Sequence, residues 1–248
     1  MCLPTNVLGK EYYSSSFTQN SNENNSNSYI TIVGVEDNTS VEIVPAATTV
    51  GGWAANSINT VTINKGQVYQ VLGTTTGNTG VDLSGTKVRS IASGSGGCKK
   101  IAVFSGTGKI SIGSPGCTGS SADNLYQQLY PVSSWGKYFL TVPSSGRPNN
   151  HYRIYRNNAA ANIYLNGTLI PSASFTNNYY QFYNNTPNSI SSDLPISLAQ
   201  YFTSQNCPTP QNPYDPDMIM LSPVEQNISK VTLVSSPPQL PNLQLLII

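Results

Sequence analysis

Tyr29-Ile30-Thr31-Ile32-Val33 and Ser40-Val41-Glu42-Ile43-Val44 are the two stretches of sequence that decide the fold. In both of them apolar and polar residues alternate, which is typical of β-strands that bury one face. Between them lies Glu36-Asp37-Asn38, whose residue types favour a turn. The same pattern returns at residues 60–63 and 67–71. The chain is therefore predicted to be all-β, with antiparallel strands joined by short turns.

The strand pattern occurs twice along the chain. Leu8-Gly9-Lys10 resembles Trp135-Gly136-Lys137, and each opens a run of strands. Each run closes with a Pro-Val pair, at Pro131-Val132 and again at Pro223-Val224. We therefore expect tandem antiparallel β-sandwich-like units with an internal repeat. The expected boundaries are residues 7–130 for the first unit, 131–222 for the second, and 223–248 for the start of an incomplete third unit.

Charged residues are scarce, at 9% of the 248 residues, and the formal net charge is +1. Nucleic-acid binding needs a clustered basic face, which this composition does not supply. No apolar run approaches the ~18 residues of a membrane span, so no membrane insertion is predicted. Asn, Ser and Thr replace the charges, as in secreted β proteins. The chain begins without an apolar export segment, so we expect an extracellular or cell-surface protein that extends beyond one or both ends.

The chain has four cysteines, Cys2, Cys98, Cys117 and Cys207, which allow three full pairings. Residues 100–105 and 109–112 are predicted to form a hairpin about Thr107, inserted in the first unit. Simple antiparallel pairing would bring Cys98 opposite about position 116. We therefore predict a Cys98–Cys117 disulfide, with two free thiols as the alternative, and the sequence leaves the pairing of Cys2 and Cys207 open. A disulfide implies an oxidising compartment.

Residues for catalysis are few. His151 is the one histidine, and no Gly-x-Ser-x-Gly elbow surrounds any serine. One histidine and four scattered cysteines do not make a zinc site. The acidic pair Glu36 and Asp37 falls in a turn, where Asp caps backbone groups. We therefore predict no catalytic site and no cofactor, and expect that the protein is not an enzyme.

A calcium site is the one metal site that the sequence suggests. Asp215 and Asp217, with Asn212, could supply oxygen ligands. The alternative, which we favour, is an Asx-type turn, because the acidic density that calcium needs is missing.

Aromatic residues are concentrated in Tyr179-Tyr180-Gln181-Phe182-Tyr183. Alternation on a strand points Tyr180 and Phe182 one way, and Tyr179 and Tyr183 the other. We expect Tyr180 and Phe182 to fill the core while the other two cover a sheet face. The alternative is that Tyr179 and Tyr183 form an aromatic platform for a glycan or a partner protein.

Several spaced motifs resemble one known family, the IgGFc-binding protein N-terminal domain. They are Asp82-Leu83-Ser84-Gly85-Thr86-Lys87-Val88, Lys100-Ile101-Ala102-Val103-Phe104-Ser105-Gly106, Gln128-Leu129-Tyr130-Pro131-Val132, and Ile163-Tyr164-Leu165-Asn166-Gly167. The resemblance covers roughly Gly9 to Val234. Residues 215–226 are similar to the version in large Bacteroidota surface proteins, including gliding-motility-associated and type IX-secreted adhesins. No residue is assigned to antibody binding.

These observations favour a non-catalytic extracellular module for structure and adhesion within a larger cell-surface or secreted protein. Its partner would be a protein or a glycan on a surface. The alternatives are a carbohydrate-binding module of a secreted enzyme and an all-β hydrolase. The unfinished third unit would leave an open sheet edge, which predicts strand-mediated self-association.

Overall fold

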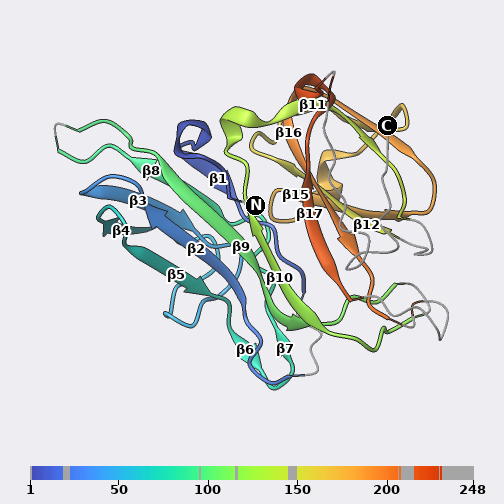
Figure 1. Ribbon diagram of the computed structural model, residues 1–248, viewed down its shortest axis with the longest axis horizontal. Coiled ribbons are helices and arrows are strands. Elements are labelled where there is room, and N and C mark those ends of the chain that lie inside the picture. Colours follow the sequence, from blue (N-terminus) through green and yellow to red (C-terminus); the bar gives the residue numbers. More distant parts are fainter. Residues whose placement is uncertain are drawn as a thin grey trace.

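The computed structural model describes residues 2–18, 23–94, 96–114, 117–144, 150–205, 207, 215–228 and 230. Figure 1 shows two groups of β-strands that lie side by side. The helical segments of the described part are 3-10 turns of three residues each: η1 (Thr5–Val7), η2 (Val132–Ser134), η3 (Ser172–Ser174) and η4 (Val224–Gln226). The prediction of an all-β protein with antiparallel sheets is confirmed.

The first group of strands forms a sandwich of two antiparallel sheets. The β1 sheet has the order β1 (Glu11–Tyr13), β8 (Lys87–Ile91), β3 (Thr39–Val44), β4 (Asn59–Ile63). The β2 sheet has the order β10 (Asp123–Gln128), β9 (Ile101–Ile110), β2 (Ser28–Gly34), β5 (Val68–Leu72). A small hairpin of β6 (Thr75–Thr76) and β7 (Thr79–Gly80) follows β5. Between the sheets lies an apolar core that includes Ile30, Ile32 and Val103.

The second group contains β11 (Gly136–Thr141), β12 (Asn150–Arg156), β13 (Ile163–Leu165), β14 (Thr168–Leu169), β15 (Tyr179–Asn184), β16 (Asn188–Phe202) and β17 (Asp217–Leu221). The long strand β16 belongs to two layers. Its first half pairs with β11 and β13, and its second half pairs with β12 and β17. We call the layer of β17, the second half of β16, β12 and β15 the β12 sheet. Its core includes Tyr152, Ile154 and Leu198.

The pairing scheme of the second group repeats that of the first. β16 replaces β8 and β9 together, so that β11 matches β1, β12 matches β2, β15 matches β5 and β17 matches β10. The register agrees as well. Gln128 and Met220, each three residues before the proline of its Pro-Val pair, lie opposite Phe104 and Ala199. On their other side Phe104 lies opposite Thr31 and Ala199 opposite Arg153, so Thr31 and Arg153 hold equivalent positions. The internal repeat is therefore present in the strand pairing. The boundaries 7–130 and 131–222 stay predictions, and residues 231–248 of the expected third unit lie outside the described residues.

The predicted hairpin about Thr107 is wrong. β9 runs without a break from Ile101 to Ile110 and pairs with β2 on one side and β10 on the other. Gly106 serves close packing rather than a turn, since a Cβ there would clash with the carbonyl of Leu125 on β10. Sequence reasoning took a glycine required by a neighbouring strand for a glycine required by a turn.

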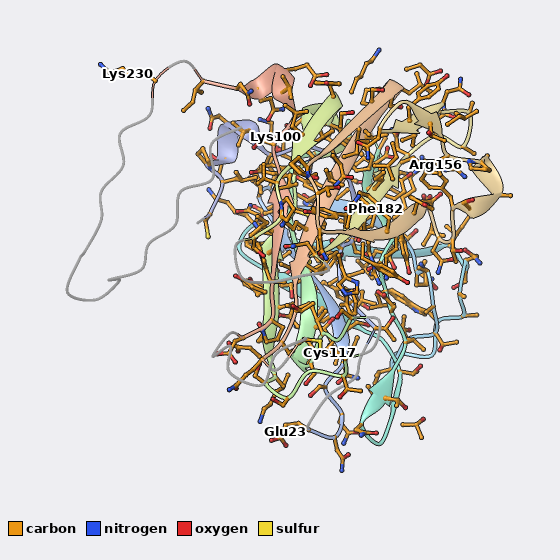
Figure 2. The ribbon with its side chains drawn as sticks, turned by 90° about the vertical axis from the view of Figure 1, so that its right-hand side faces the viewer. Glu23, Lys100, Cys117, Arg156, Phe182 and Lys230 are labelled. Atoms are coloured by element: carbon orange, nitrogen blue, oxygen red, sulfur yellow. A yellow bond between two sulfur atoms is a disulfide. The ribbon has the colours of Figure 1, made fainter. Side chains whose placement is uncertain are left out.

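The predicted Cys98–Cys117 disulfide is also wrong. Cys117 is bonded to Cys207, with a Cα–Cα distance of 5.3 Å, and Cys98 is an exposed free thiol. Because β9 does not fold back, its ends lie about 30 Å apart at ~3.3 Å per residue. Cys98 precedes one end and Cys117 follows the other. Figure 2 shows Cys117 well below Phe182 and Arg156 of the second group of strands.

Candidate functional site

The two groups of strands meet through a shared junction, where β10 and β17 lie close together (Figure 1). A third apolar cluster fills it. This cluster takes Ile110, Ile112 and Leu125 from the first unit and Tyr155, Ala199, Tyr201 and Met218 from the second. All of these side chains are at most 1% exposed. The junction is therefore packed like a domain interior, and the two units form one body.

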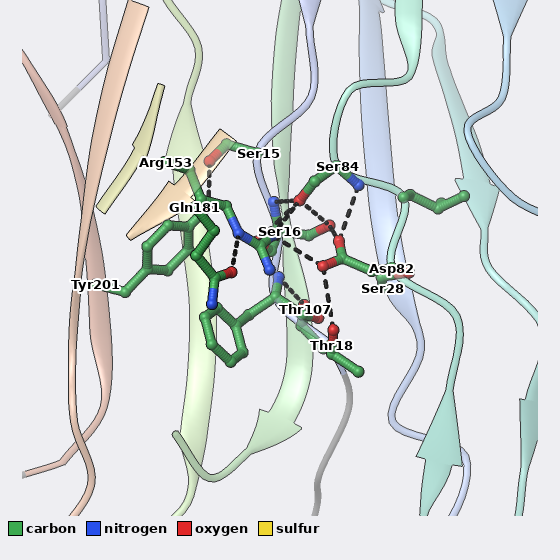
Figure 3. A network of polar contacts seen from close by, with 12 residues as sticks. Ser15, Ser16, Thr18, Ser28, Asp82, Ser84, Thr107, Arg153, Gln181 and Tyr201 are labelled. Carbon is green, nitrogen blue, oxygen red and sulfur yellow. Dashed lines mark hydrogen bonds and ion pairs between the residues drawn. The ribbon is translucent and has the colours of Figure 1, made fainter. Parts of the chain in front are cut away.

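Arg153 of β12 lies at the centre of this junction (Figure 3). Its guanidinium reaches across to the first unit, where Nη1 lies 2.8 Å from Oδ2 of Asp82. Nη1 also donates hydrogen bonds of 2.7 Å to the carbonyl of Ser16 and of 2.7 Å to Oγ of Ser84. On the second unit, Nε donates to Oε1 of Gln181 at 2.8 Å. The Arg153 side chain is 2% exposed, so these contacts replace its water.

Three aromatic rings surround the guanidinium. The Arg153 Cζ lies 4.7 Å from the ring centroid of Phe17, 4.5 Å from that of Tyr179 and 5.2 Å from that of Tyr201. Their π faces attract the positive charge while they exclude water. The cation of the second unit is therefore enclosed by rings from both units.

The ion pair is charged on both sides at neutral pH. Burial acts to raise the pKa of Asp82, but the Arg153 charge and hydrogen bonds from Ser84 and Ser16 outweigh it, so the pKa lies below its ordinary value. Burial acts to lower the pKa of Arg153, and the Asp82 charge raises it well above its ordinary value. The pair thus joins the units through charges that neither unit could bury alone.

His151, the one histidine, lies in the same junction at the start of β12 and is 5% exposed. Its Nε2 is 2.7 Å from the carbonyl oxygen of Gly113, which can only accept, so Nε2 carries the proton. Burial lowers its pKa, and the Arg153 charge adds to that effect. Its ring contacts those of Phe17 and Tyr183. A buried imidazole with a structural hydrogen bond explains this histidine without catalysis.

The aromatic strand β15 faces the core and the junction. Phe182 is 8% exposed, and Tyr180 packs beside it on the core of the second unit, as expected. Tyr179 lies against Arg153 and Tyr155 at the junction, and Tyr183 is 51% exposed. Arg153 thus lies over one face of the Tyr179 ring, and the platform of Tyr179 and Tyr183 stays a prediction.

Other acidic residues lie apart from one another. Glu42 forms a salt bridge of 2.7 Å with Arg89 on the neighbouring strand β8. Asp215 and Asp217 are exposed near the start of β17, and Asn212 lies outside the described residues. Within the described part, no group of three or more His, Cys, Asp or Glu is placed to hold a metal ion. The calcium site stays an untested prediction.

The loop before β4 forms a small cleft beside β5. The cleft has a volume of about 180 Å³ and is lined by Thr49, Val50, Gly51, Trp53 and residues 69–72. The rings of Trp53 and Tyr69 stack with a centroid distance of 6.1 Å and an angle of 17°. Both rings also pack against the apolar core, which holds them in place. Sequence analysis missed this site, since Trp53 lies in a loop and shows no strand pattern.

The strand next to this cleft is the edge of its sheet. Within the described residues β5 pairs with one strand, β2, on one side. On its other side the loop pairs with the end of β5 through the Thr49–Gly73 bridge and through Val50 N–H, which donates to Leu72 O at 2.9 Å. The cleft therefore adjoins an edge strand. An extended peptide could pair with this edge and add a further strand to the sheet.

No helix in the described part is long and apolar enough to cross a membrane.

Comparisons with known proteins identify the family. No curated protein and no solved structure matches the chain. The family model described as IgGFc binding protein matches residues 1–248, which is the whole sequence. The chain therefore belongs to the IgGFc-binding protein family.

Proposed function

We propose that this chain is a non-catalytic extracellular module that binds a protein ligand. The family is one of extracellular binding modules, and the Cys117–Cys207 disulfide fits an oxidising compartment. The observation that carries the proposal is the cleft of Trp53 and Tyr69 beside the edge strand β5. Two stacked rings held by the core offer preformed apolar area, which binds at low entropic cost.

The binding mode follows from the cleft's position. An extended segment of the partner would add to β5 through backbone hydrogen bonds and place an apolar side chain beside Trp53. Val50, at the mouth of the cleft, is 60% exposed, so it can contact a ligand without any change in the fold. The family's description names the Fc part of immunoglobulin G, which makes Fc the first probe to use.

The test is binding of immobilised Fc fragment, with Fab as the reference, by surface plasmon resonance. We expect Val50→Glu to weaken Fc binding at least about tenfold, because a carboxylate at the mouth would be desolvated by the ligand. The matched control is Leu169→Glu, an exposed apolar residue of the second unit. If Val50→Glu and the wild type bind Fc equally well, the cleft is not the binding site. If the wild type does not bind Fc, then Fc is not the ligand.

A carbohydrate-binding module is the second candidate, favoured by the stacked Trp53 and Tyr69, since sugars bind aromatic faces. A glycan array run with the same Val50→Glu protein separates the two. If the wild type binds a glycan but not Fc, and Val50→Glu loses the glycan binding, then the ligand of the cleft is a sugar and not a protein.

We also propose that the module belongs to a larger adhesive surface protein of the Bacteroidota type. Pro223 and η4 repeat the way Pro131 and η2 open the second unit, which supports a tandem array. The gene that encodes the chain provides the test: flanking export and sorting segments with further units would support it, and an isolated reading frame would contradict it.

A further inference from the structure

One sheet face is covered in the second unit and open in the first. The face of the β12 sheet that points away from its own core carries Arg153, Tyr155, Tyr179 and Tyr201. The first unit covers it with Ile110, Leu125 and other side chains of the junction. In this fold, then, the outer face of such a sheet is a surface on which another β unit packs.

The corresponding face of the β2 sheet is largely open among the described residues, where Ala102 (8% exposed) and Gln128 (5% exposed) are its two buried members. Its members follow from strand alternation, because Ile30, Ile32 and Val103 point into the core and their neighbours point outward. They are Tyr29, Thr31, Val33, Val68, Gln70, Leu72, Ala102, Phe104, Tyr126 and Gln128. None of these side chains is charged. Val68 is 60% exposed and Tyr126 is 53% exposed.

Aromatic rings on this open face are held by contacts with one another and with the sheet backbone. Tyr29 and Tyr126 lie on either side of Gly106, and the hydroxyl of Tyr29 donates to the carbonyl of Leu125 at 2.8 Å. The ring of Tyr126 stacks on Phe104 with a centroid distance of 5.3 Å and an angle of 5°. Preordered rings lose little entropy when a partner covers them.

A groove limits the face at one end. Residues near the N-terminus cross there, where the Leu3 N–H donates to Oε1 of Gln128 at 2.6 Å. Between them and the sheet lies a groove of about 400 Å³, whose mainly apolar lining includes Leu3, Leu8, Val33 and Phe104, with Lys65 as its one charged residue. The open face thus continues into an apolar groove, so a partner can bury more than the sheet surface alone.

We propose that a second copy of this chain covers the open face, in a two-fold dimer that buries the two faces against each other. Thr31 occupies the position on the open face that Arg153 occupies on the covered face. Because Thr31 is uncharged, a partner that covers the open face does not need an acidic residue there. An uncharged face can lie against an identical one without like-charge repulsion, and a two-fold contact uses the same patch twice. This contact involves a sheet face, and so differs from strand-mediated association at an open edge.

Sedimentation velocity of the full chain over about a hundredfold range of concentration tests the proposal. We expect a monomer–dimer equilibrium that stops at the dimer, because a two-fold contact closes on itself. Tyr126→Lys and, separately, Val68→Lys should each raise the dimer dissociation constant at least about tenfold. The control Ile58→Lys, at a residue that is 72% exposed and outside the face, should leave it unchanged.

Each other outcome overturns the dimer. A monomer at every concentration would mean that the face stays open or binds a different partner. Oligomers that keep growing would mean an open-ended contact. A dimer that both face variants leave intact would place the contact elsewhere. These variants leave Val50 unchanged, and sedimentation needs no ligand. The dimer can therefore be confirmed or rejected independently of the Fc experiment.

Discussion

At the scale of single residues, Arg153 shows how the two units are joined. A guanidinium that is 2% exposed needs partners for its charge, and Asp82 and Ser84 supply them from the other unit. Both partners lie in the stretch Asp82–Val88, one of the motifs that carried the family resemblance. The motif residues therefore have a structural role, as the acceptors for a cation from the next unit.

Arg153→Met tests this role. Removal of the cation leaves the Asp82 carboxylate buried without its partner, which costs about 3–5 kcal/mol of unfolding free energy. Urea unfolding followed by tryptophan fluorescence measures the loss. The matched control is Arg89→Met, whose side chain is 41% exposed beside Glu42, and it should cost no more than about 1 kcal/mol. Equal losses in the two variants would contradict the buried ion pair.

His151 makes stability depend on pH. Its folded-state pKa is lowered, so the unfolded imidazole, which titrates near ~6.5, takes up a proton first on acidification. The contribution of the neutral ring is therefore complete above about pH 6.5 and is lost as the pH falls toward the folded-state pKa. We expect the melting temperature to fall between about pH 7 and pH 5, and His151→Gln to flatten this slope. An unchanged slope in the variant would assign the effect to other groups.

At the scale of elements, a proline followed by a 3-10 turn opens each unit. Pro4 precedes η1, Pro131 precedes η2 and Pro223 precedes η4, with φ values of −67°, −65° and −71°. Each later proline packs on a glycine of the unit before it, Pro131 on Gly9 and Pro223 on Gly136. Gly9 and its counterpart Gly136 are thus the points at which each unit contacts the proline that opens the next unit.

Gly9→Ala and Gly136→Ala should both destabilise the protein. A Cβ at either position would clash with the proline ring, and such overpacking costs about 1–3 kcal/mol. Gly97→Ala is the control, because nothing lies within 4 Å of a Cβ there. Thermal unfolding of the three variants measures the difference. If Gly9→Ala unfolds no earlier than Gly97→Ala, the glycine–proline contact does not matter for stability.

At the scale of the whole molecule, the disulfide closes the junction that Arg153 and the apolar cluster form. Cys117 follows β9 and Cys207 follows β16, so corresponding loops of the two units are joined across 90 residues. The neighbouring backbone is paired as well, since Ser204 N–H donates to Ile112 O at 2.8 Å and Ser120 N–H to Gln205 O at 2.9 Å. The two units are consequently linked at the centre and at one end of their interface.

Cys207→Ser should therefore cost on the order of 4 kcal/mol, the chain-entropy value for a loop of that length. Denaturant unfolding with and without a reducing agent measures it. Cys98→Ser should leave stability unchanged, because Cys98 is exposed and unbonded. Peptide mapping without reduction gives a direct check: a fragment that joins Cys98 to Cys117 would contradict the structure.

The strand pattern was predictable from sequence, whereas the partners of individual residues were not. Tyr180 and Phe182 pack on the core as alternation indicated, because alternation depends only on the pleat of one strand. Tyr179 was expected to cover a sheet face, but alternation did not show that the first unit packs on that face, since a residue's own strand does not reveal what covers it. Gly106 and Trp53 were misjudged or missed for the same reason: their roles depend on neighbours distant in sequence.

The sequence by itself determined the all-β class and the internal repeat, because strand periodicity, turn residues and repeated motifs are local properties of the chain. Only the tertiary structure decided that Cys117 bonds Cys207, that Arg153 bonds Asp82, and that one sheet face is covered while its counterpart is largely open among the described residues. Each of these depends on which distant segments meet. The packing of one unit on the next settles that, and no local pattern encodes it.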